Sequence, residues 1–219
     1  MRRDVIRQTV VVLAVVATVA VNGLANALPL NGQNTGEISD RFDVYFVPAG
    51  YVFSIWGLIY LALAAYAVFQ ALPAQRESQA LRETGYLFVL SSVANILWLF
   101  FWHYELFGLS LVAMVALLLS LIGVYLRLGI GRGSASVREQ WLVRVPFSIY
   151  LGWITVATIA NATSLLDYVG WSGWGIGPEA WMVVMLIVAM CIAGTVSLTR
   201  RDVAYTLVIL WAFVGIAVK

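Results

Sequence analysis

Long uninterrupted runs of hydrophobic residues dominate the chain, and short polar segments separate them. A helix needs about 20 apolar residues to cross the hydrocarbon core of a bilayer. The strict polar and apolar alternation of membrane β-strands does not describe these runs. The pattern therefore predicts an all-α, polytopic membrane helical bundle with seven transmembrane helices, the last one short, at residues 5–27, 49–72, 84–103, 107–128, 142–166, 178–198 and 203–218.

The composition agrees with a location in the membrane. Of the 219 residues, 62% are hydrophobic and 11% are charged, and the mean hydropathy is +0.91. Such a chain cannot cover a water-facing surface. The first run follows a basic start, as in a signal peptide, but it exceeds the usual length, so we expect a retained helix. We expect an integral, multi-pass protein of a bacterial inner (cytoplasmic) membrane, with the lipid bilayer as its surroundings.

The positive charges predict the orientation, because cytoplasmic loops carry the excess of Lys and Arg. With a cytoplasmic N-terminus, two of the 13 positive residues, Arg41 and Lys219, fall outside. The remaining eleven fall on the cytoplasmic side: Arg2, Arg3, Arg7, Arg76, Arg82, Arg127, Arg132, Arg138, Arg144, Arg200 and Arg201. We predict that the N-terminus is cytoplasmic and the C-terminus outside. The net charge of +2 follows from this topology and does not indicate a nucleic-acid partner.

The most informative motif runs from Pro48 to Tyr60, at the start of the second predicted helix. Phe53, Trp56 and Tyr60 recur at helical spacing, so they share one face. A lipid-facing surface does not need such a pattern, whereas a pocket for a flat apolar ligand uses aromatic walls with a few polar groups. The motif therefore favours binding of a hydrophobic small molecule.

Two later helices carry similar stripes. Asn95 and Trp98 share a face of the third predicted helix. The fifth predicted helix places four residues on one face: Tyr150, Trp153, Ala157 and Asn161. Taken alone, either asparagine is an interhelical hydrogen-bonding group, worth about 0.6 to 2 kcal/mol. Three stripes of similar chemistry on separate helices instead favour one shared cavity.

These stripes resemble the TspO/MBR family, the tryptophan-rich sensory proteins related to the mitochondrial translocator protein. The matching features are a proline before the Phe, Trp and Tyr stripe, the Asn-x-x-Trp pair, and a Tyr-Leu-x-Trp segment followed by Ala and Asn. The resemblance implies a TspO-like five-helix unit over residues 1–168, with an outer loop at 29–47, and two additional helices in 169–219. Its ligand-binding residues would be Pro48, Phe53, Trp56, Tyr60, Asn95, Trp98, Tyr150, Trp153, Ala157 and Asn161.

The resemblance also implies the kind of ligand. Porphyrins, other tetrapyrroles or sterol-like molecules would bind without being obligatory cofactors, in a sensory, regulatory or transport role. A pigment-like molecule such as a carotenoid is a further candidate ligand. The chain departs from the family pattern where Ala49 follows Pro48 in place of a second proline. It also lacks the Lys or Arg that the family's sterol motif has after the position of Tyr168. The loop at 29–47 is either a lid or a solvated linker.

Other classes of function find less support. The sequence shows no catalytic dyad, paired carboxylates or metal-ligand spacing, so we do not expect an enzyme. His103, the single histidine, could reach a tetrapyrrole metal, but we expect a solvated interfacial side chain. Lys219 is the only lysine and is terminal, which excludes a retinal Schiff base.

Two alternatives remain open. No charged residue falls near the centre of a predicted helix, which argues against ion-coupled transport but leaves a passive transporter of apolar small molecules. The additional helices and interfacial tryptophans would also suit an accessory subunit of a larger membrane complex, for example a pigment-containing photosynthetic one. A homodimer is equally compatible with the sequence.

Overall fold

The computed structural model of the protein describes residues 2–42 and 44–219. In this part of the chain, six helical segments are long and apolar enough to cross a membrane, and a shorter apolar helix follows them. The helices are α1 (Arg2–Ala27), α3 (Ile55–Ala71), α4 (Gln79–His103), α5 (Phe107–Arg127), α7 (Val145–Tyr168), α8 (Pro178–Arg200) and the shorter α9 (Val203–Ala217). The predicted all-α bundle with a short seventh helix is confirmed.

Short elements connect these helices. They are η1 (Leu30–Gly32), α2 (Thr35–Ser39), η2 (Gly50–Ser54), η3 (Pro73–Gln75), α6 (Val137–Glu139), η4 (Gln140–Arg144) and η5 (Gly173–Gly175). The turn η2 leads directly into α3, and α6 and η4 lead directly into α7. The fifth predicted helix therefore starts at residue 137 and not at 142.

The earlier start has a physical reason in Pro146. Proline lacks the N–H that would bond to the carbonyl four residues earlier, and its ring crowds that carbonyl. The turn η4, which is π-helical, ends at Arg144, two residues before Pro146. A π-helical turn is wider than an α-helical turn, so the helix can pass through this position without breaking.

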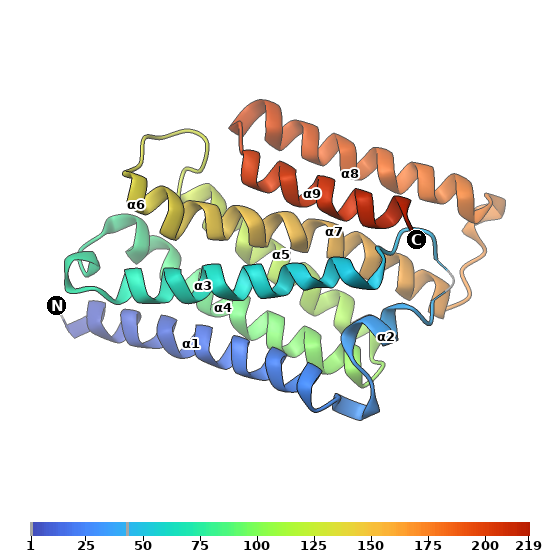
Figure 1. Ribbon diagram of the computed structural model, residues 1–219, viewed down its shortest axis with the longest axis horizontal. Coiled ribbons are helices and arrows are strands. Elements are labelled where there is room, and N and C mark those ends of the chain that lie inside the picture. Colours follow the sequence, from blue (N-terminus) through green and yellow to red (C-terminus); the bar gives the residue numbers. More distant parts are fainter. Residues whose placement is uncertain (1, 43) are drawn as a thin grey trace.

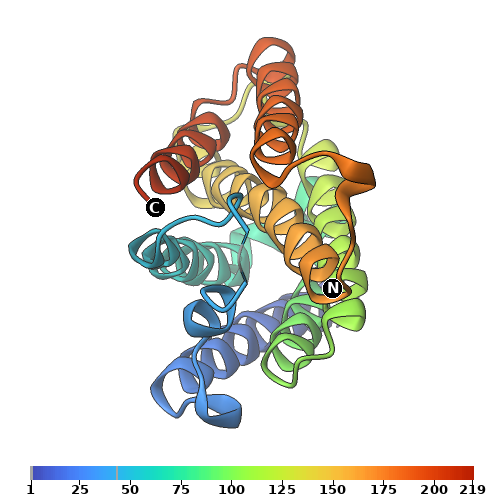
Figure 2. The same ribbon diagram turned by 90° about the vertical axis from the view of Figure 1, so that its right-hand side faces the viewer.

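The seven hydrophobic helices lie side by side along the long axis of the molecule (Figure 1). The helix α4 packs along α5 and α1, α5 also packs along α7, and α1 also contacts α3. The helix α9 lies on α7, and α8 lies at the periphery of the bundle (Figure 2). Among the side chains of α8 that the structure describes, Ala189 alone is buried. Most of the apolar surface of α8 therefore faces outward.

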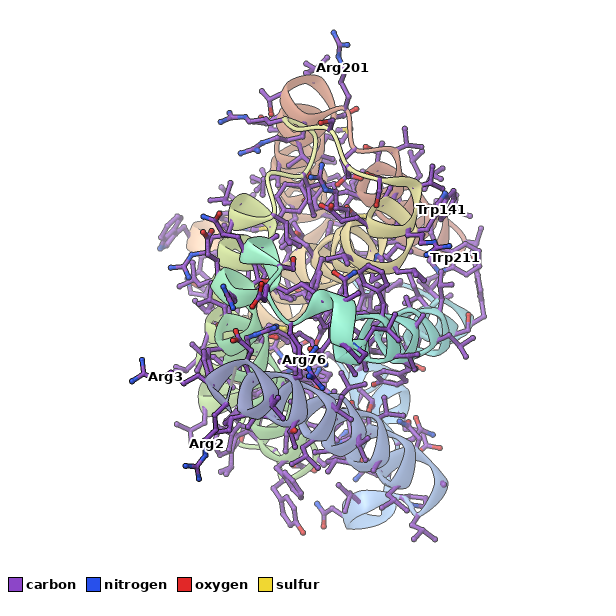
Figure 3. The ribbon with its side chains drawn as sticks, turned by 90° about the vertical axis from the view of Figure 1, so that its left-hand side faces the viewer. Arg2, Arg3, Arg76, Trp141, Arg201 and Trp211 are labelled. Atoms are coloured by element: carbon purple, nitrogen blue, oxygen red, sulfur yellow. The ribbon has the colours of Figure 1, made fainter. Side chains whose placement is uncertain are left out.

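The two ends of the bundle differ in charge. The end that holds the N-terminus carries the four arginines labelled in Figure 3, which are Arg2, Arg3, Arg76 and Arg201. We call it the inner end and the opposite end the outer end. The two positive residues assigned to the outside form ion pairs there, Arg41 with Glu105 at 2.9 Å and Lys219 with Asp40 at 3.0 Å. The positive residues named here therefore lie at the two opposite ends of the bundle to which the predicted orientation assigns them.

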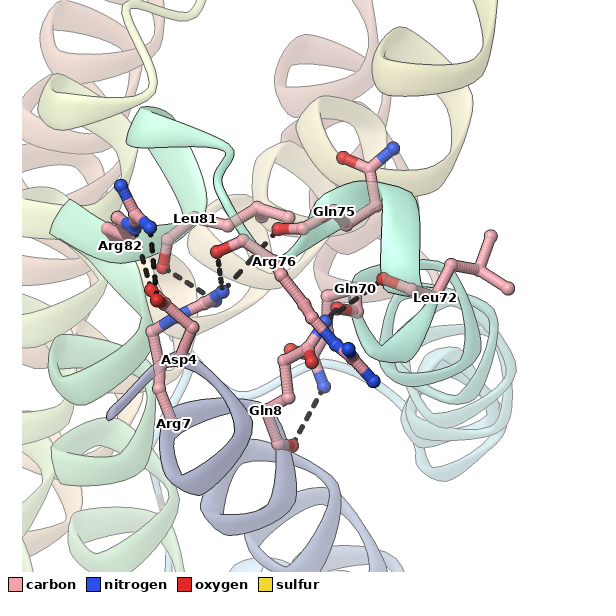
Figure 4. A network of polar contacts seen from close by, with 9 residues as sticks. All are labelled: Asp4, Arg7, Gln8, Gln70, Leu72, Gln75, Arg76, Leu81 and Arg82. Atoms are coloured by element: carbon pink, nitrogen blue, oxygen red, sulfur yellow. Dashed lines mark hydrogen bonds and ion pairs between the residues drawn. The ribbon is translucent and has the colours of Figure 1, made fainter. Parts of the chain in front are cut away.

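A network of polar contacts closes the inner end between α1, α3 and α4 (Figure 4). Asp4 accepts two hydrogen bonds from the Arg82 guanidinium, at 2.6 and 3.0 Å. The buried Arg7 donates to the Leu81 carbonyl in the first turn of α4, at 3.1 Å, and to the Arg76 carbonyl between α3 and α4, at 3.2 Å. Gln8 and Gln70 each donate to the other's backbone carbonyl, at 2.6 and 3.1 Å. These bonds pair polar groups that would otherwise be costly to bury.

Small residues allow α9 to approach the rest of the bundle closely. A Cβ atom at Gly152 of α7 would lie 3.1 Å from the Tyr205 carbonyl oxygen of α9. A Cβ atom at Gly215 would overlap the side chain of Val52, which is fully buried in η2. Helices in membranes associate mainly through such close packing, because lipid is as apolar as their side chains.

Asp202, the residue directly before α9, holds the inner end of this helix in place. The side chain of Asp202 is buried and caps α9 by accepting from the Tyr205 N–H at 3.1 Å. Its other carboxylate oxygen accepts from the hydroxyls of Tyr125 in α5, at 2.9 Å, and Ser148 in α7, at 2.6 Å. One carboxylate therefore joins three helices.

Candidate functional site

The three aromatic stripes meet at one place in the outer half of the bundle. Trp56 of α3 is at the centre, with its ring centroid 6.1 Å from that of Trp98 in α4 and 6.2 Å from that of Trp153 in α7. Tyr60 stacks on Trp56 at 5.5 Å, and Phe53 meets Trp153 edge to face at 5.7 Å. Such ring pairs add about 0.5–1.5 kcal/mol each to the burial of their area. The predicted convergence of stripes on separate helices is therefore present in the fold.

A small cavity of about 40 Å³ lies beside these rings, deep between α3, α4 and α7. Seven of the ten predicted ligand-binding residues line it: Pro48, Phe53, Trp56, Trp98, Trp153, Ala157 and Asn161. It also reaches Trp102 and Ser164, and Thr35 and Ser39 of the segment α2 close it from the outer side. We call this space the inner cavity.

A larger space of about 360 Å³ lies next to the inner cavity and shares the rings of Phe53, Trp56 and Trp98 with it. Tyr60, the eighth predicted residue, lines this space. We call it the mouth. Its other walls are more polar, because the end of α1 and the segment around α2 supply them: Asn22, Asn26, Asn34, Thr35, Gly36, Glu37 and Asp40. The arrangement combines flat apolar walls with polar groups at the outer rim, as ligand pockets commonly do.

Several polar atoms around the inner cavity are buried and lack a hydrogen-bond partner among the described residues. They are the indole N–H groups of Trp98 and Trp153, the amide oxygen of Asn161 and the hydroxyl of Ser164. The Asn161 amide nitrogen, by contrast, donates to the Ser110 hydroxyl at 3.0 Å. Buried polar groups are nearly always paired, so unpaired ones indicate a place for water or for a ligand's polar atoms. The inner cavity could hold such a partner.

Asn95 and Tyr150, the other two predicted residues, lie outside the linings of both spaces. They are fully buried, and Tyr150 meets the Trp56 ring edge to face at 6.1 Å. The Asn95 amide oxygen accepts a hydrogen bond from the Asn22 side chain of α1 at 2.8 Å. In this position Asn95 joins two helices, and Tyr150 supports the aromatic wall from behind.

The outer loop, predicted at 29–47, folds over the site, and all of it but residue 43 lies in the described part of the chain. The short helix α2 begins with a capping box between Asn34 and Glu37. The Thr35 carbonyl accepts from the Trp102 indole N–H at 3.2 Å. The ion pairs of Arg41 and Asp40 connect the loop to Glu105, in the turn between α4 and α5, and to the C-terminal Lys219. We call residues 29–42 and 44–47 the lid.

Two residues of the site are missing from the predicted set of ligand-binding residues, although the sequence carries a signal for each. Trp102 follows Trp98 by one helical turn and so extends the same face of α4. Asn22 is one of the few amides in the apolar run of α1, and a buried amide in a membrane helix needs a partner. Both positions could therefore be found from residue type and spacing alone.

The expectation for His103 was wrong. Its side chain is 1% exposed, and its Nδ1 lies 2.8 Å from the Leu99 carbonyl oxygen. The lid covers this end of α4, where Asn31 donates to the His103 carbonyl at 3.0 Å. Within residues 2–42 and 44–219, no three or more His, Cys, Asp or Glu side chains gather as a metal site.

Fold and site together define a polytopic helical membrane protein with an aromatic-walled cavity under a lid at its outer end. The chain belongs to the family of TSPO-like proteins, whose model matches residues 8–219. This match confirms the resemblance drawn from the three stripes, and it extends through α8 and α9. The boundary at residue 168 between a five-helix unit and an extension stays a prediction. A search of curated proteins and a search of solved structures each found no match.

Proposed function

We propose that this protein binds a flat hydrophobic ligand of the tetrapyrrole class, or a pigment-like or sterol-like molecule of similar shape, between α3, α4 and α7. The observation that carries the proposal is the convergence of five aromatic rings on a cavity with unpaired buried indole N–H groups. A flat ring system would stack on Trp56 and Tyr60, and its polar atoms would accept from Trp98 or Trp153.

The sizes of the two spaces limit how such a ligand binds. The inner cavity, at about 40 Å³, has room for little more than water, which needs only about 10–15 Å³ of such volume. The mouth, at about 360 Å³, lies at the small end of the range of about 300–1,000 Å³ for ligand sites. A tetrapyrrole would therefore enter the mouth edge first and require the lid to move outward. The ligand would then favour an open or rearranged lid, which is a population shift.

Such a shift suits a sensory or regulatory role, with the lid as the element that changes. The lid lies at the outer end, where a partner or the medium could detect it. We place the protein in the cytoplasmic membrane of a bacterium, with the lid on the outer side. The ligand would be bound reversibly and not held as an obligatory cofactor, and the protein would not be an enzyme.

Passive transport is a weaker alternative, because the inner half of the bundle is filled. Three mutually packed rings, Tyr66, Phe88 and Phe147, have centroids 5.0–5.7 Å apart and are at most 1% exposed. Tyr66 follows Trp56 by ten residues, or about 15 Å along α3. The polar network of Figure 4 lies further inward. A molecule in the mouth would have to displace both layers to cross.

An accessory-subunit role is favoured by one observation, the nearly unburied helix α8. A partner protein could cover this helix, and a second copy of the chain could do the same. Lipid covers an apolar helix equally well, so we rank this role below ligand binding. A binding protein retains its ligand affinity when purified alone, whereas an accessory subunit is recovered with its partners.

Titration of the purified full chain with protoporphyrin IX tests the proposal, with tryptophan quenching as the readout. We expect Trp56→Ala and Trp153→Ala each to weaken binding by about five- to thirtyfold, since each loses a stacked ring or a donor worth about 1–2 kcal/mol. Trp174→Ala is the control, because Trp174 is 78% exposed and lies outside both spaces. Circular dichroism verifies folding, because truncating a buried tryptophan costs about 3–5 kcal/mol. Unchanged affinity in both cavity variants would refute the site.

A further inference from the structure

A second, larger space lies on another side of the bundle. It is a groove of about 990 Å³ between α3 and α9, with the start of α7 beneath it. Its lining and those of the inner cavity and mouth have no described residue in common. Figure 1 shows α3 and α9 on either side of α7. The groove therefore does not belong to the proposed tetrapyrrole site.

Apolar side chains line the groove along most of its length. Val203, Leu207 and Trp211 follow one another at four-residue spacing along α9, and Leu58 faces them from α3. From Val203 to Trp211 the helix rises about 12 Å. Leu58 and Leu207 are 52% and 59% exposed, so the groove is open to the surrounding hydrocarbon. Its volume and its open apolar side leave room for an extended acyl chain.

The inner end of the groove is strongly basic. Four arginines line it: Arg132, Arg144, Arg200 and Arg201. Arg144 is buried and paired with Glu139 at 3.0 Å, and Arg200 donates to the Ile130 carbonyl at 3.3 Å. Arg132 and Arg201 are exposed, and neither has a carboxylate within ion-pair distance among the residues that the structure describes. Two positive charges at this end are therefore available to an anion.

The backbone holds these arginines together. Gly131 has a φ of +77°, and a Cβ atom there would overlap the Arg200 carbonyl oxygen. The loop after α5 thus packs directly against the turn between α8 and α9. The Asp202 carboxylate, which also lines the groove, accepts from Tyr125, Ser148 and the Tyr205 N–H. Three of its roughly four acceptor sites are used within the protein, and it forms no ion pair with Arg132 or Arg201.

Two tryptophans line the groove, and the one at its basic end indicates its depth in the bilayer. Trp141 is 66% exposed beside the basic end, and Trp211 lies further along α9, where its indole N–H donates to the Val52 carbonyl at 3.2 Å. Figure 3, seen from the inner end, shows both on the same side of the molecule. Tryptophan is enriched where hydrocarbon meets headgroups. The exposed Trp141 therefore supports a position of these arginines near the inner-leaflet headgroups.

We propose that the groove binds an anionic phospholipid of the inner leaflet, with its phosphate near Arg132 and Arg201 and one acyl chain between α3 and α9. A basic pocket between membrane helices on the cytoplasmic side is a chemistry that recognises anionic headgroups. The apolar length explains why a lipid fits better than a free anion, since each buried methylene adds to the affinity. The bound chain would also cover the face of α9 that the bundle leaves open.

Native mass spectrometry of the full chain in detergent tests this proposal. Phosphatidylglycerol and phosphatidylcholine with identical chains are added separately. We expect tighter binding of phosphatidylglycerol, and a loss of about thirtyfold in that affinity in Arg132→Gln/Arg201→Gln. The matched control is Arg2→Gln/Arg3→Gln, which removes two exposed arginines from the same end but away from the groove (Figure 3). This control should bind phosphatidylglycerol like the wild type.

A second variant tests the apolar part. Ala204→Phe places a ring in the groove and should weaken binding of phosphatidylglycerol while the four arginines remain. Equal affinity for the two lipids, or an equal loss in the control double variant, would overturn the proposal. Displacement of phosphatidylglycerol by millimolar inorganic phosphate would indicate a free-anion site and would overturn it as well.

Discussion

Replacing Asp202 by alanine should loosen the inner end of α9 from the bundle. This carboxylate is buried, caps α9 and accepts from the hydroxyls of Tyr125 and Ser148. Loss of an N-cap costs about 1 kcal/mol. Each hydroxyl then loses its acceptor, at a cost of about 1 kcal/mol at the low end of the range, because a hydroxyl can rotate toward another acceptor. The total expected loss is about 3 kcal/mol.

Asp202→Asn separates the charge from the cap. Asparagine is as good an N-cap as aspartate. With its amide oxygen in the capping position, its NH2 group faces the hydroxyl oxygens of Tyr125 and Ser148 and can donate to them, but no charged acceptor is left there. Hydrogen bonds to a charged group are worth about 1 kcal/mol more than neutral ones, so we expect a loss of about 1–2 kcal/mol. The ordering, with alanine worse than asparagine and both worse than aspartate, is the specific signature of this junction.

Reversible unfolding in mixed micelles of SDS and a mild detergent, followed by circular dichroism, measures these free energies. The control is Asp167→Ala, which removes an exposed carboxylate at the outer end of α7. Surface changes of this kind usually stay within about 0.5 kcal/mol. If Asp202→Ala also stayed within that range, the carboxylate would not fasten α9, and our account of how this helix docks would be wrong.

Three further predictions address other contacts. Gly215→Ala should destabilise the protein by about 1–3 kcal/mol in the same unfolding assay, because the added Cβ overlaps a buried side chain. The control Gly194→Ala lies in open space on α8 and should be neutral or stabilising. Equal effects of the two substitutions would contradict the close packing of α9. Arg41→Gln removes a lid ion pair and should speed both association and dissociation of protoporphyrin IX in stopped-flow quenching; unchanged rates would show that the lid does not gate the mouth. A double-mutant cycle of Asn22→Ala and Asn95→Ala should give a coupling of about 0.6–2 kcal/mol, and a value near zero would exclude this interhelical bond.

Hydrophobic periodicity was sufficient to predict the helices and the convergence of the aromatic stripes. A helix must bury its distinctive face, and Trp56 packs against both Trp98 and Trp153. Spacing also places Asn95 and Tyr150 on those faces, but helical spacing alone does not show whether a residue reaches the cavity or lies behind its wall. In the fold these two residues lie behind the wall, because Asn95 pairs with Asn22 of α1.

The docking of α9 and the burial of His103 could not be predicted in this way. Glycines are common in membrane helices, so the presence of Gly152 and Gly215 in the sequence does not by itself indicate a close contact between helices. His103 occupies the last turn of α4, where the sequence indicates exposure, but Asn31 of the lid covers it. Both features depend on contacts between segments far apart in the chain. The helix α2, by contrast, had a local signal in the Asn34 and Glu37 capping box.

Purification of the full chain from its native membrane in mild detergent, with particle mass and absorption spectrum recorded together, tests the central claim most directly. We expect a small particle that carries tetrapyrrole or carotenoid absorbance, or that acquires protoporphyrin IX stoichiometrically when it is added. A small colourless particle that takes up none would contradict the binding site between α3, α4 and α7. A large assembly whose pigment stays with the other subunits would assign the protein the accessory role instead.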